Sequence, residues 1–305
     1  MYPTGRRQID LRYYMATSTS NTSRRPKVFV ARALLPEAEQ ILENAERVEV
    51  ELWKEEGVIP REELLKKVKG CTVFHKIDKE VLDAAGPQVK VVSTVSVGYD
   101  HVDVKELRKR NILLGYTPGV LTDATAAYSS IGVGCGTLRQ SKATAIRLRP
   151  FIGVNGTIIY SGNTDKPYAD EIRATRVEFD TLLRESDIIC VTCALTSQTK
   201  EMFDYDTFKK MKNSVVFVNS ARGGLVKQDD LVRALSENLL GSVGLDVTTP
   251  EPLDPQDPLL KYDNVFALPH IGTATFETRM LIHSMAIENL LAGVWGKPLP
   301  HAVQL

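Results

Sequence analysis

Short apolar runs alternate with amphipathic segments of helical period along most of this chain of 305 residues. In the N-terminal part the strand-like runs are KVFVA (27–31), VKVVST (89–94) and ILLGYT (112–117). Helical segments lie between them, among them one that starts at Pro36 and one that closes at Gly86, residues suited to a first helical turn and to a helix end. Strands that alternate with helices predict a parallel α/β sheet.

A second run of the same kind extends from about residue 131 to about 270, and a long amphipathic segment, 277–296, follows it. Its strand-like pieces include TIIY (157–160), IICVTCAL (188–195), SVVFVNS (214–220) and SVGLDV (242–247). The chain is long enough for two domains of ordinary size, each with its own core. We therefore expect an α/β fold with two doubly wound parallel sheets.

The charges of the chain are balanced, with 38 basic and 38 acidic residues. A balanced chain has no overall field that would attract nucleic acid or an anionic membrane. No apolar run approaches the roughly 20 residues that span a bilayer. We expect neither nucleic acid nor membrane as a partner.

Cys190 and Cys193 form a C-x-x-C motif within an apolar, strand-like run. Residues an odd number of positions apart on a strand point to opposite faces, so the two thiols cannot share a metal ion or form a disulfide bond. We expect no metal site. Reduced, buried thiols are typical of intracellular proteins, and we expect a cytoplasmic location.

Residues 1–26 are polar and rich in Ser and Thr, so we expect a disordered tail. Five arginines and one acidic residue also resemble a weak mitochondrial transit peptide. The alternative, which we favour, is an extended gene start with Met15 as the true beginning.

Several strand-like runs are followed by a residue suited to ligand binding: Gly98, Ser161, Arg222, Asp246 and His270. Ligands of open α/β sheets bind outside the carboxyl ends of the strands. A series of strands that each end in such a residue therefore predicts one cleft.

Arg222, Glu251 and His270 together supply the groups needed to reduce a 2-oxo acid. An arginine can bind the substrate carboxylate and polarise the ketone oxygen. A histidine can donate a proton near neutral pH, and a carboxylate beside it favours the protonated ring. Each residue alone is weak evidence; the prediction rests on their combination.

The blocks VVFVNSARGGLVKQDDLVRAL, GLDVTTPEPLDPQDPLL and NVFALPHIGTAT, in this order and spacing, resemble the signature motifs of the D-2-hydroxyacid dehydrogenases. Within that family the chain is most similar to the glyoxylate/hydroxypyruvate reductases. The segment LDAAGPQVKVVSTVSVGYDHVDVKELRKRNILLGYTPGVLTDATA carries the same resemblance in the N-terminal half. The resemblance covers residues 27–127 and 145–305.

The resemblance implies a flavodoxin-like substrate domain over 27–121 and a Rossmann-like dinucleotide-binding domain over 122–284. Residues 285–305 would form a helix and tail that return to the substrate domain. The implied reaction is the NADPH-dependent reduction of glyoxylate or hydroxypyruvate to glycolate or D-glycerate, in a homodimer.

The same resemblance assigns a role to individual residues. Arg222 would bind the substrate carboxylate and ketone, His270 would be the acid/base, and Glu251 its paired carboxylate. The backbone amides of Val97 and Gly98 would hold the substrate carboxylate, since a glycine lets an anion approach closely. The implied cofactor contacts are Gly134, Gly136, Ser161, Gly162, Ala194, Ser220, Asp246 and Gly272.

The stretch IGVGCGTLRQSK (131–142) departs from the family's G-x-G-x-x-G turn. One register places Gly136 first but leaves Leu138 and Ser141 at the other two glycine positions. The other starts with Gly134 and Gly136 but puts Arg139 third. Neither register is intact, although the second glycine admits the pyrophosphate and the third lets helix and strand pack closely.

The segment before this stretch is short as well. Tyr128–Ser130 stand where the family has a long helix and an arm used for dimer packing. We therefore expect an incomplete nucleotide domain and a missing dimer arm, as from a skipped exon or a faulty gene model. The alternative function is a catalytically impaired or non-catalytic dinucleotide-sensing protein of the same fold.

Cofactor preference follows from the residues after TIIY. An NAD site usually has Asp or Glu at this position to hold the ribose 2′-hydroxyl. Here Ser161 and Gly162 occupy it, and the first acid is Asp165. With Lys166 nearby, these residues favour NADPH over NADH, although the relatives' arginine is replaced by Asn163.

Overall fold

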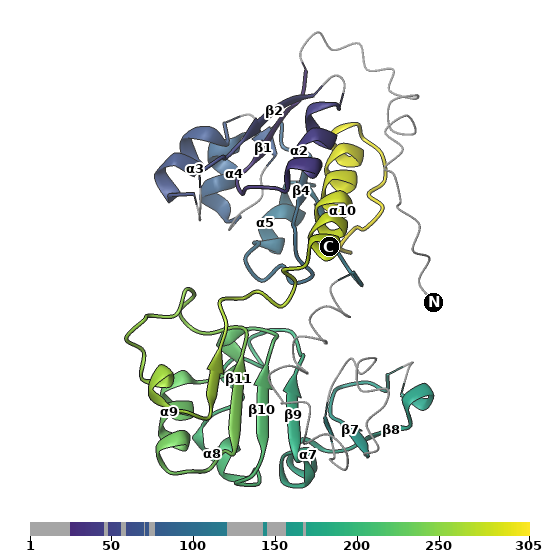
Figure 1. Ribbon diagram of the computed structural model, residues 1–305. Coiled ribbons are helices and arrows are strands. Elements are labelled where there is room, and N and C mark those ends of the chain that lie inside the picture. Colours follow the sequence, from purple (N-terminus) through teal and green to yellow (C-terminus); the bar gives the residue numbers. More distant parts are fainter. Residues whose placement is uncertain are drawn as a thin grey trace. The chain divides into compact units, whose positions relative to one another are not determined.

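The computed structural model describes residues 25–45, 48–55, 59–69, 71–72, 77–120, 143–144, 157–166 and 169–305. The chain divides into two compact units, Met1–Leu121 with Thr275–Leu305, and Thr122–Ala274 (Figure 1). The expected return to the first unit at residue 285 falls inside a continuous helix, α10 (Phe276–Val294). The division lies at Thr275, whose hydroxyl oxygen accepts a hydrogen bond from the Thr278 N–H and caps that helix.

The strands of the first unit are β1 (Lys27–Val30), β2 (Glu49–Leu52), β3 (Cys71–Thr72), β4 (Val91–Ser93) and β5 (Leu113–Gly115). They pair in parallel in the orders β2-β1-β3 and β4-β5, and β3 is in contact with β4. This sequence of strands is the 2-1-3-4-5 order of flavodoxin-like folds. The first unit therefore has the expected α/β class.

The helices of the first unit are α2 (Pro36–Glu43), α3 (Arg61–Lys67), α4 (Lys79–Ala85), α5 (Val104–Lys109) and α10. Pro36 is in the first turn of α2, and Gly86 ends α4 with φ of 91°, as the sequence predicted. Alternate strand residues feed two cores: Phe29 packs with α3, α4 and α5, whereas Val28 and Val30 pack with α2 and α10. Helices therefore cover both faces of the strands (Figure 1).

The strands of the second unit are β6 (Ala143–Thr144), β7 (Ile158–Tyr160), β8 (Ala174–Arg176), β9 (Ile188–Val191), β10 (Val216–Asn219), β11 (Ser242–Leu245) and β12 (Val265–Ala267). Their order in the sheet is β12-β11-β10-β9-β6-β7-β8, and every pairing is parallel. Read from β8, the first six strands have the 3-2-1-4-5-6 order of the Rossmann fold, with β12 added beyond them.

The α-helices described in the second unit are α7 (Phe179–Glu185), α8 (Tyr205–Lys209) and α9 (Gln228–Ser236). Short 3-10 turns complete it: η3 (Asp170–Ile172), η4 (Gly223–Leu225) and η5 (Pro258–Lys261). Side chains of α7, α8 and α9 join one buried cluster with Ile189, Phe217 and Val243 of the central strands. These helices therefore pack on one face of the sheet.

The structure bears on two further predictions from the sequence, one about the C-x-x-C motif and one about membrane spans. Cys190 is buried in β9, Cys193 lies beyond the end of that strand, and both thiols are free. Burial raises the pKa of the Cys190 thiol to about 12, so this thiol is not reactive at neutral pH.

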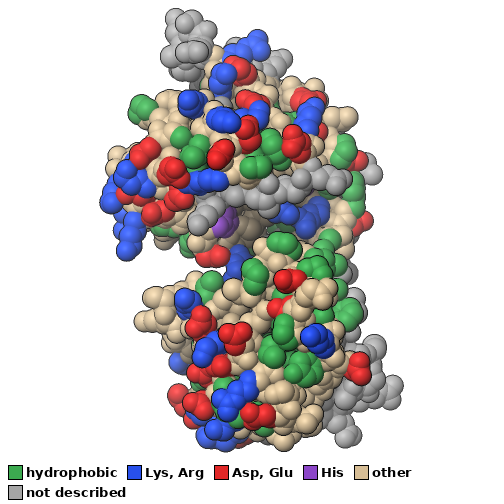
Figure 2. Space-filling view, turned by 90° about the vertical axis from the view of Figure 1, so that its left-hand side faces the viewer, with side chains coloured by type: hydrophobic (Ala, Val, Ile, Leu, Met, Phe, Trp, Pro, Cys, Tyr) green, Lys and Arg blue, Asp and Glu red, His purple; other side chains and the backbone are tan. Residues whose placement is uncertain are grey.

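Within the described ranges, none of the helices has the length and apolarity to cross a bilayer. Basic and acidic side chains are interspersed on the face shown in Figure 2.

Candidate active site

Three consecutive strands of the second unit each deliver one of the predicted residues. Arg222 follows β10, Asp246 directly follows β11, and His270 follows β12. Because β10, β11 and β12 are parallel neighbours, their carboxyl ends lie at the same edge of the sheet. The sheet therefore brings these three residues to one side, as the sequence predicted.

The turn that carries Arg222 is held by a residue that the sequence analysis did not single out. Asn219 is buried; its side-chain amide donates to the carbonyl oxygen of Arg222 (2.9 Å), and its side-chain oxygen accepts from the Ala221 N–H (3.1 Å). A Cβ added at Gly223 would lie 1.9 Å from the carbonyl oxygen of Thr248. The first glycine of ARGG is therefore required by this close approach of two chain segments.

Glu251 and His270 form a direct pair. His270 Nδ1 lies 3.0 Å from one carboxylate oxygen of Glu251, and the other oxygen accepts the Thr248 N–H at 3.1 Å. His270 has φ of 55°, a left-handed conformation that non-glycine residues adopt uncommonly. Both side chains remain partly exposed, at 50% for His270 and 39% for Glu251, so the imidazole is accessible from solvent.

The electrostatics of this pair favour an ionised carboxylate. Partial burial is the largest single influence and acts to raise the pKa of Glu251, but several opposing interactions, led by the hydrogen bond and charge of His270, together hold the pKa below its ordinary value. The Thr248 N–H and the Arg222 charge act in the same direction. An ionised Glu251 accepts a hydrogen bond from the Nδ1–H of His270, which leaves Nε2 as the nitrogen that can exchange a proton with a ligand.

Asp246 has a structural role at the same edge of the sheet. Its two carboxylate oxygens accept the backbone N–H groups of Ile271 (2.8 Å) and Gly272 (2.9 Å), and the Asp246 side chain is mostly buried. These bonds fix the two residues that follow His270. Asp246 thus ties the end of β11 to the turn after β12, and Gly272, another predicted cofactor residue, is held by it.

The remaining predicted cofactor residues lie at carboxyl ends of the same sheet, except for the glycine pair. Ala194 follows β9 and its carbonyl oxygen accepts from the Thr199 hydroxyl (2.7 Å); Ser220 follows β10. Ser161 and Gly162 follow β7. Gly134 and Gly136 lie outside the described residues and precede β6, whereas a phosphate-binding turn follows the first strand of a Rossmann fold. Their role stays a prediction.

Val97 and Gly98 belong to the first unit, in the loop after β4. The Thr117 N–H donates to the carbonyl oxygen of Ser96 (3.1 Å), and the Ser96 hydroxyl donates to the carbonyl oxygen of Gly98 (2.6 Å). The loop is thus supported by the segment that follows β5. Its role in binding a substrate carboxylate stays a prediction.

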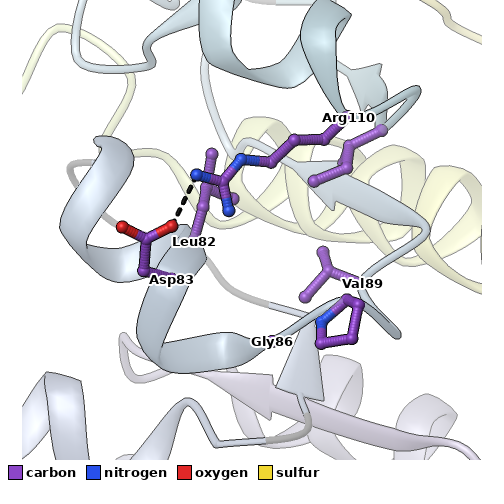
Figure 3. A pocket seen from close by; sticks show the side chains of 7 residues that line it. Leu82, Asp83, Gly86, Val89 and Arg110 are labelled. Atoms are coloured by element: carbon purple, nitrogen blue, oxygen red, sulfur yellow. Dashed lines mark hydrogen bonds and ion pairs between the residues drawn. The ribbon is translucent and has the colours of Figure 1, made fainter.

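A cavity of about 430 Å³ in the first unit lies at the opposite end of the same strands (Figure 3). Its lining includes Gly86 and Val89, which precede β4, and Arg110, which precedes β5. The Arg110 guanidinium is 2.6 Å from the Asp83 carboxylate, and Glu106 also contacts it. The charge of Arg110 is therefore neutralised within the protein, and the cavity is separate from the Val97–Gly98 loop.

Comparison with known proteins decides the family. A family model described as "D-isomer specific 2-hydroxyacid dehydrogenase, NAD binding domain" matches residues 126–272. The glyoxylate reductase/hydroxypyruvate reductase of Mus musculus is 40% identical over 325 aligned positions, which cover 92% of this chain and 98% of the relative. The chain belongs to the D-2-hydroxyacid dehydrogenase family. The resemblance predicted from the motifs is confirmed, and the family is one of oxidoreductases.

Further D-2-hydroxyacid dehydrogenase relatives agree. The glyoxylate reductase of Thermococcus litoralis is 34% identical and covers 92% of this chain and 97% of the relative. The crystal structure of a glyoxylate reductase from Paecilomyes thermophila matches with a TM-score of 0.81 at 25% identity, covering 92% of this chain and 99% of that one. The 325 positions aligned with the mouse relative outnumber the 305 residues of this chain, so that relative has residues without a counterpart here.

Proposed function

We propose that this chain reduces glyoxylate and hydroxypyruvate to glycolate and D-glycerate, with NADPH as the preferred reductant and NADH second. The observation that supports the proposal most directly is the pairing of His270 with Glu251 at 3.0 Å. This pair lies at the sheet edge that also carries Arg222 and Asp246. The names of the mouse and Thermococcus relatives agree with such a substrate class.

Arg222, His270 and Glu251 each have a separate role in the proposed reaction. Arg222 binds the carboxylate of the 2-oxo acid and polarises the ketone oxygen, because a guanidinium can donate two parallel hydrogen bonds. Nε2 of His270 donates the proton that the ketone oxygen gains, and Glu251 stabilises the charged imidazolium before that transfer.

The second unit suits a dinucleotide. Its strand order is that of a Rossmann fold, and the residues after β7 and β9 to β12 lie where such folds bind a nucleotide. Ser161, Gly162, Ala194, Ser220 and Gly272 would line that position. The reduced nicotinamide supplies a hydride to the ketone carbon when it is bound.

The alternative is a non-catalytic protein that senses dinucleotides. A protein that only senses dinucleotides does not require an accessible imidazole that a carboxylate holds in position. The Glu251–His270 pair therefore favours the enzyme, since His270 has a left-handed φ and Glu251 accepts a supporting hydrogen bond from the Thr248 N–H.

The first test is a fluorescence titration of the purified chain with NADPH and NADH, followed by turnover of glyoxylate and hydroxypyruvate. We expect tighter binding of NADPH, turnover of both acids, and loss of turnover without loss of NADPH binding in His270→Ala. A folded chain that binds neither dinucleotide would refute the proposal. Dinucleotide binding without turnover of either acid would support the sensor instead.

A further inference from the structure

The end of β7 is the position that distinguishes the two dinucleotides. In the strand order of this sheet β7 is the second strand, whose end meets the adenosine ribose in a Rossmann fold. The residues that follow it, Ser161 and Gly162, carry no carboxylate to bind a ribose 2′-hydroxyl. The basic side chains around Gly162 therefore decide which ribose this position accepts.

Arg176 reaches this position from the neighbouring strand. It is the last residue of β8, and parallel pairing places it opposite Tyr160, the last residue of β7. Its Nε donates to the carbonyl oxygen of Gly162 at 3.0 Å, and its Nη1 lies 3.3 Å from the Asp165 carboxylate. The guanidinium is thus anchored beside Gly162 while 43% of the side chain is exposed.

Lys166 borders the same glycine. Its backbone N–H donates to the Tyr160 hydroxyl (3.2 Å), which folds the segment after β7 back over the strand end. A Cβ built on Gly162 would lie 3.7 Å from Cε and 3.9 Å from Nζ of Lys166. The ammonium group therefore lies next to the bare Cα of Gly162, where no side chain separates it from a ligand.

Asp165 is the acid nearest to Gly162 in the chain, and it is paired with Arg176. This carboxylate is 83% exposed, so the ion pair is a surface pair and is easily exchanged. A phosphate monoester carries more charge than a carboxylate and offers more acceptor oxygens to a guanidinium. Arg176 can therefore exchange Asp165 for a phosphate without leaving its anchor on Gly162.

We propose that Arg176 and Lys166 bind the 2′-phosphate of NADPH, with Arg176 in place of the arginine that the sequence lacks at Asn163. The proposal rests on the proposed function in that the same sheet edge binds the dinucleotide. The sequence alone gives no sign of this role for Arg176, because Arg176 belongs to a different strand, β8. Only the register of β7 and β8 brings it to Gly162.

The test measures dissociation constants of the full-length chain for NADPH, NADH, 2′,5′-ADP and 5′-AMP by calorimetry. We expect Arg176→Gln to weaken NADPH and 2′,5′-ADP about tenfold or more, while NADH and 5′-AMP are unchanged, because a charge-assisted pair is lost. Lys166→Gln acts in the same direction. Asp165→Asn tightens NADPH and 2′,5′-ADP but neither NADH nor 5′-AMP, because the anion that competes with the 2′-phosphate is removed.

Arg184→Gln is the matched control, since Arg184 is an exposed arginine of the same unit on α7. It leaves all four constants unchanged. An unchanged NADPH-to-NADH ratio in Arg176→Gln overturns the proposal, and so does an equal loss of both nucleotides, which would locate the effect away from the 2′-phosphate.

The two smaller ligands, 2′,5′-ADP and 5′-AMP, distinguish failure of this proposal from failure of the proposed function. If the wild-type chain binds neither dinucleotide, the proposed function fails. A preference for 2′,5′-ADP over 5′-AMP that Arg176→Gln abolishes would still support the phosphate site, and no preference would overturn it.

Discussion

The Glu251–His270 pair is the contact on which the chemistry depends, and Glu251→Gln tests it with little change of shape. A glutamine oxygen can still accept the Thr248 N–H, so the local fold is retained. The imidazolium loses its anionic partner, and we expect kcat/KM to fall roughly 10- to 100-fold, within the range of acid/base contributions. Steady-state kinetics of glyoxylate reduction measure this loss.

The matched control is Glu277→Gln, which removes a carboxylate from the first turn of α10. We expect its kcat/KM to equal that of the wild type. A Glu251→Gln enzyme with an unchanged kcat/KM would show that the carboxylate does not assist proton donation by His270.

At the scale of single residues, the sequence motifs predicted the side chains that define them, but not the residues that position those side chains. Arg222, Glu251 and His270 were predicted as site residues because each belongs to a block of recognisable order and spacing. Asn219 and Thr248 were missed, although they lie in or beside those blocks, because their role depends on backbone groups that no side-chain pattern reveals. Arg176 was missed because its position depends on the pairing of β7 with β8.

At the scale of elements, His283 links two helices of the first unit. It is 6% exposed on α10, and its Nδ1 accepts the N–H of Leu35, the residue that caps α2 (3.3 Å). Burial, followed by the positive charges of Arg279 and Arg32, lowers the pKa of His283 to about 4. The folded chain therefore keeps this imidazole neutral at pH values where the unfolded chain protonates it.

The consequence is a loss of stability in acid. Between pH 6.5, the ordinary value for histidine, and pH 4, the unfolded chain binds more protons at this residue, so the free energy of unfolding falls as the pH falls. The full loss for this shift is about 3 kcal/mol, and the contribution is flat above pH 6.5. Urea unfolding at a series of pH values measures it.

His283→Gln supplies the comparison, because a glutamine oxygen can accept the Leu35 N–H and does not titrate. The difference in unfolding free energy between wild type and variant should change over this pH interval, while carboxylates common to both cancel. Parallel curves for the two proteins would contradict the assignment.

Elements with local signals were predictable, and elements fixed by distant pairing were not. Pro36 and Gly86 mark the start of α2 and the end of α4, because proline and glycine act on the backbone where they stand. The first strand of the second unit gave no such signal. This strand, β6, lies at Ala143–Thr144, beyond the glycine-rich stretch, where it pairs with β7 and β9.

At the scale of the whole molecule, each buried core is built from one unit only. The clusters around Phe29 and Val28 draw on residues before 121 and after 275, and those around Phe217 and Ile158 draw on residues between them. A unit with its own core can unfold by itself. We therefore expect two transitions in calorimetry, and NADPH should raise only the transition of the second unit.

The size of that shift follows from mass action. A ligand at about 100 times its dissociation constant stabilises the state that binds it by about 2.7 kcal/mol. For the Arg176→Gln chain, a tenfold weaker complex at the same NADPH concentration keeps about 1.4 kcal/mol, so this chain should lose about half of the gain from NADPH while keeping the gain from NADH. A single transition that NADPH raises as a whole would show instead that the two units unfold as one cooperative body.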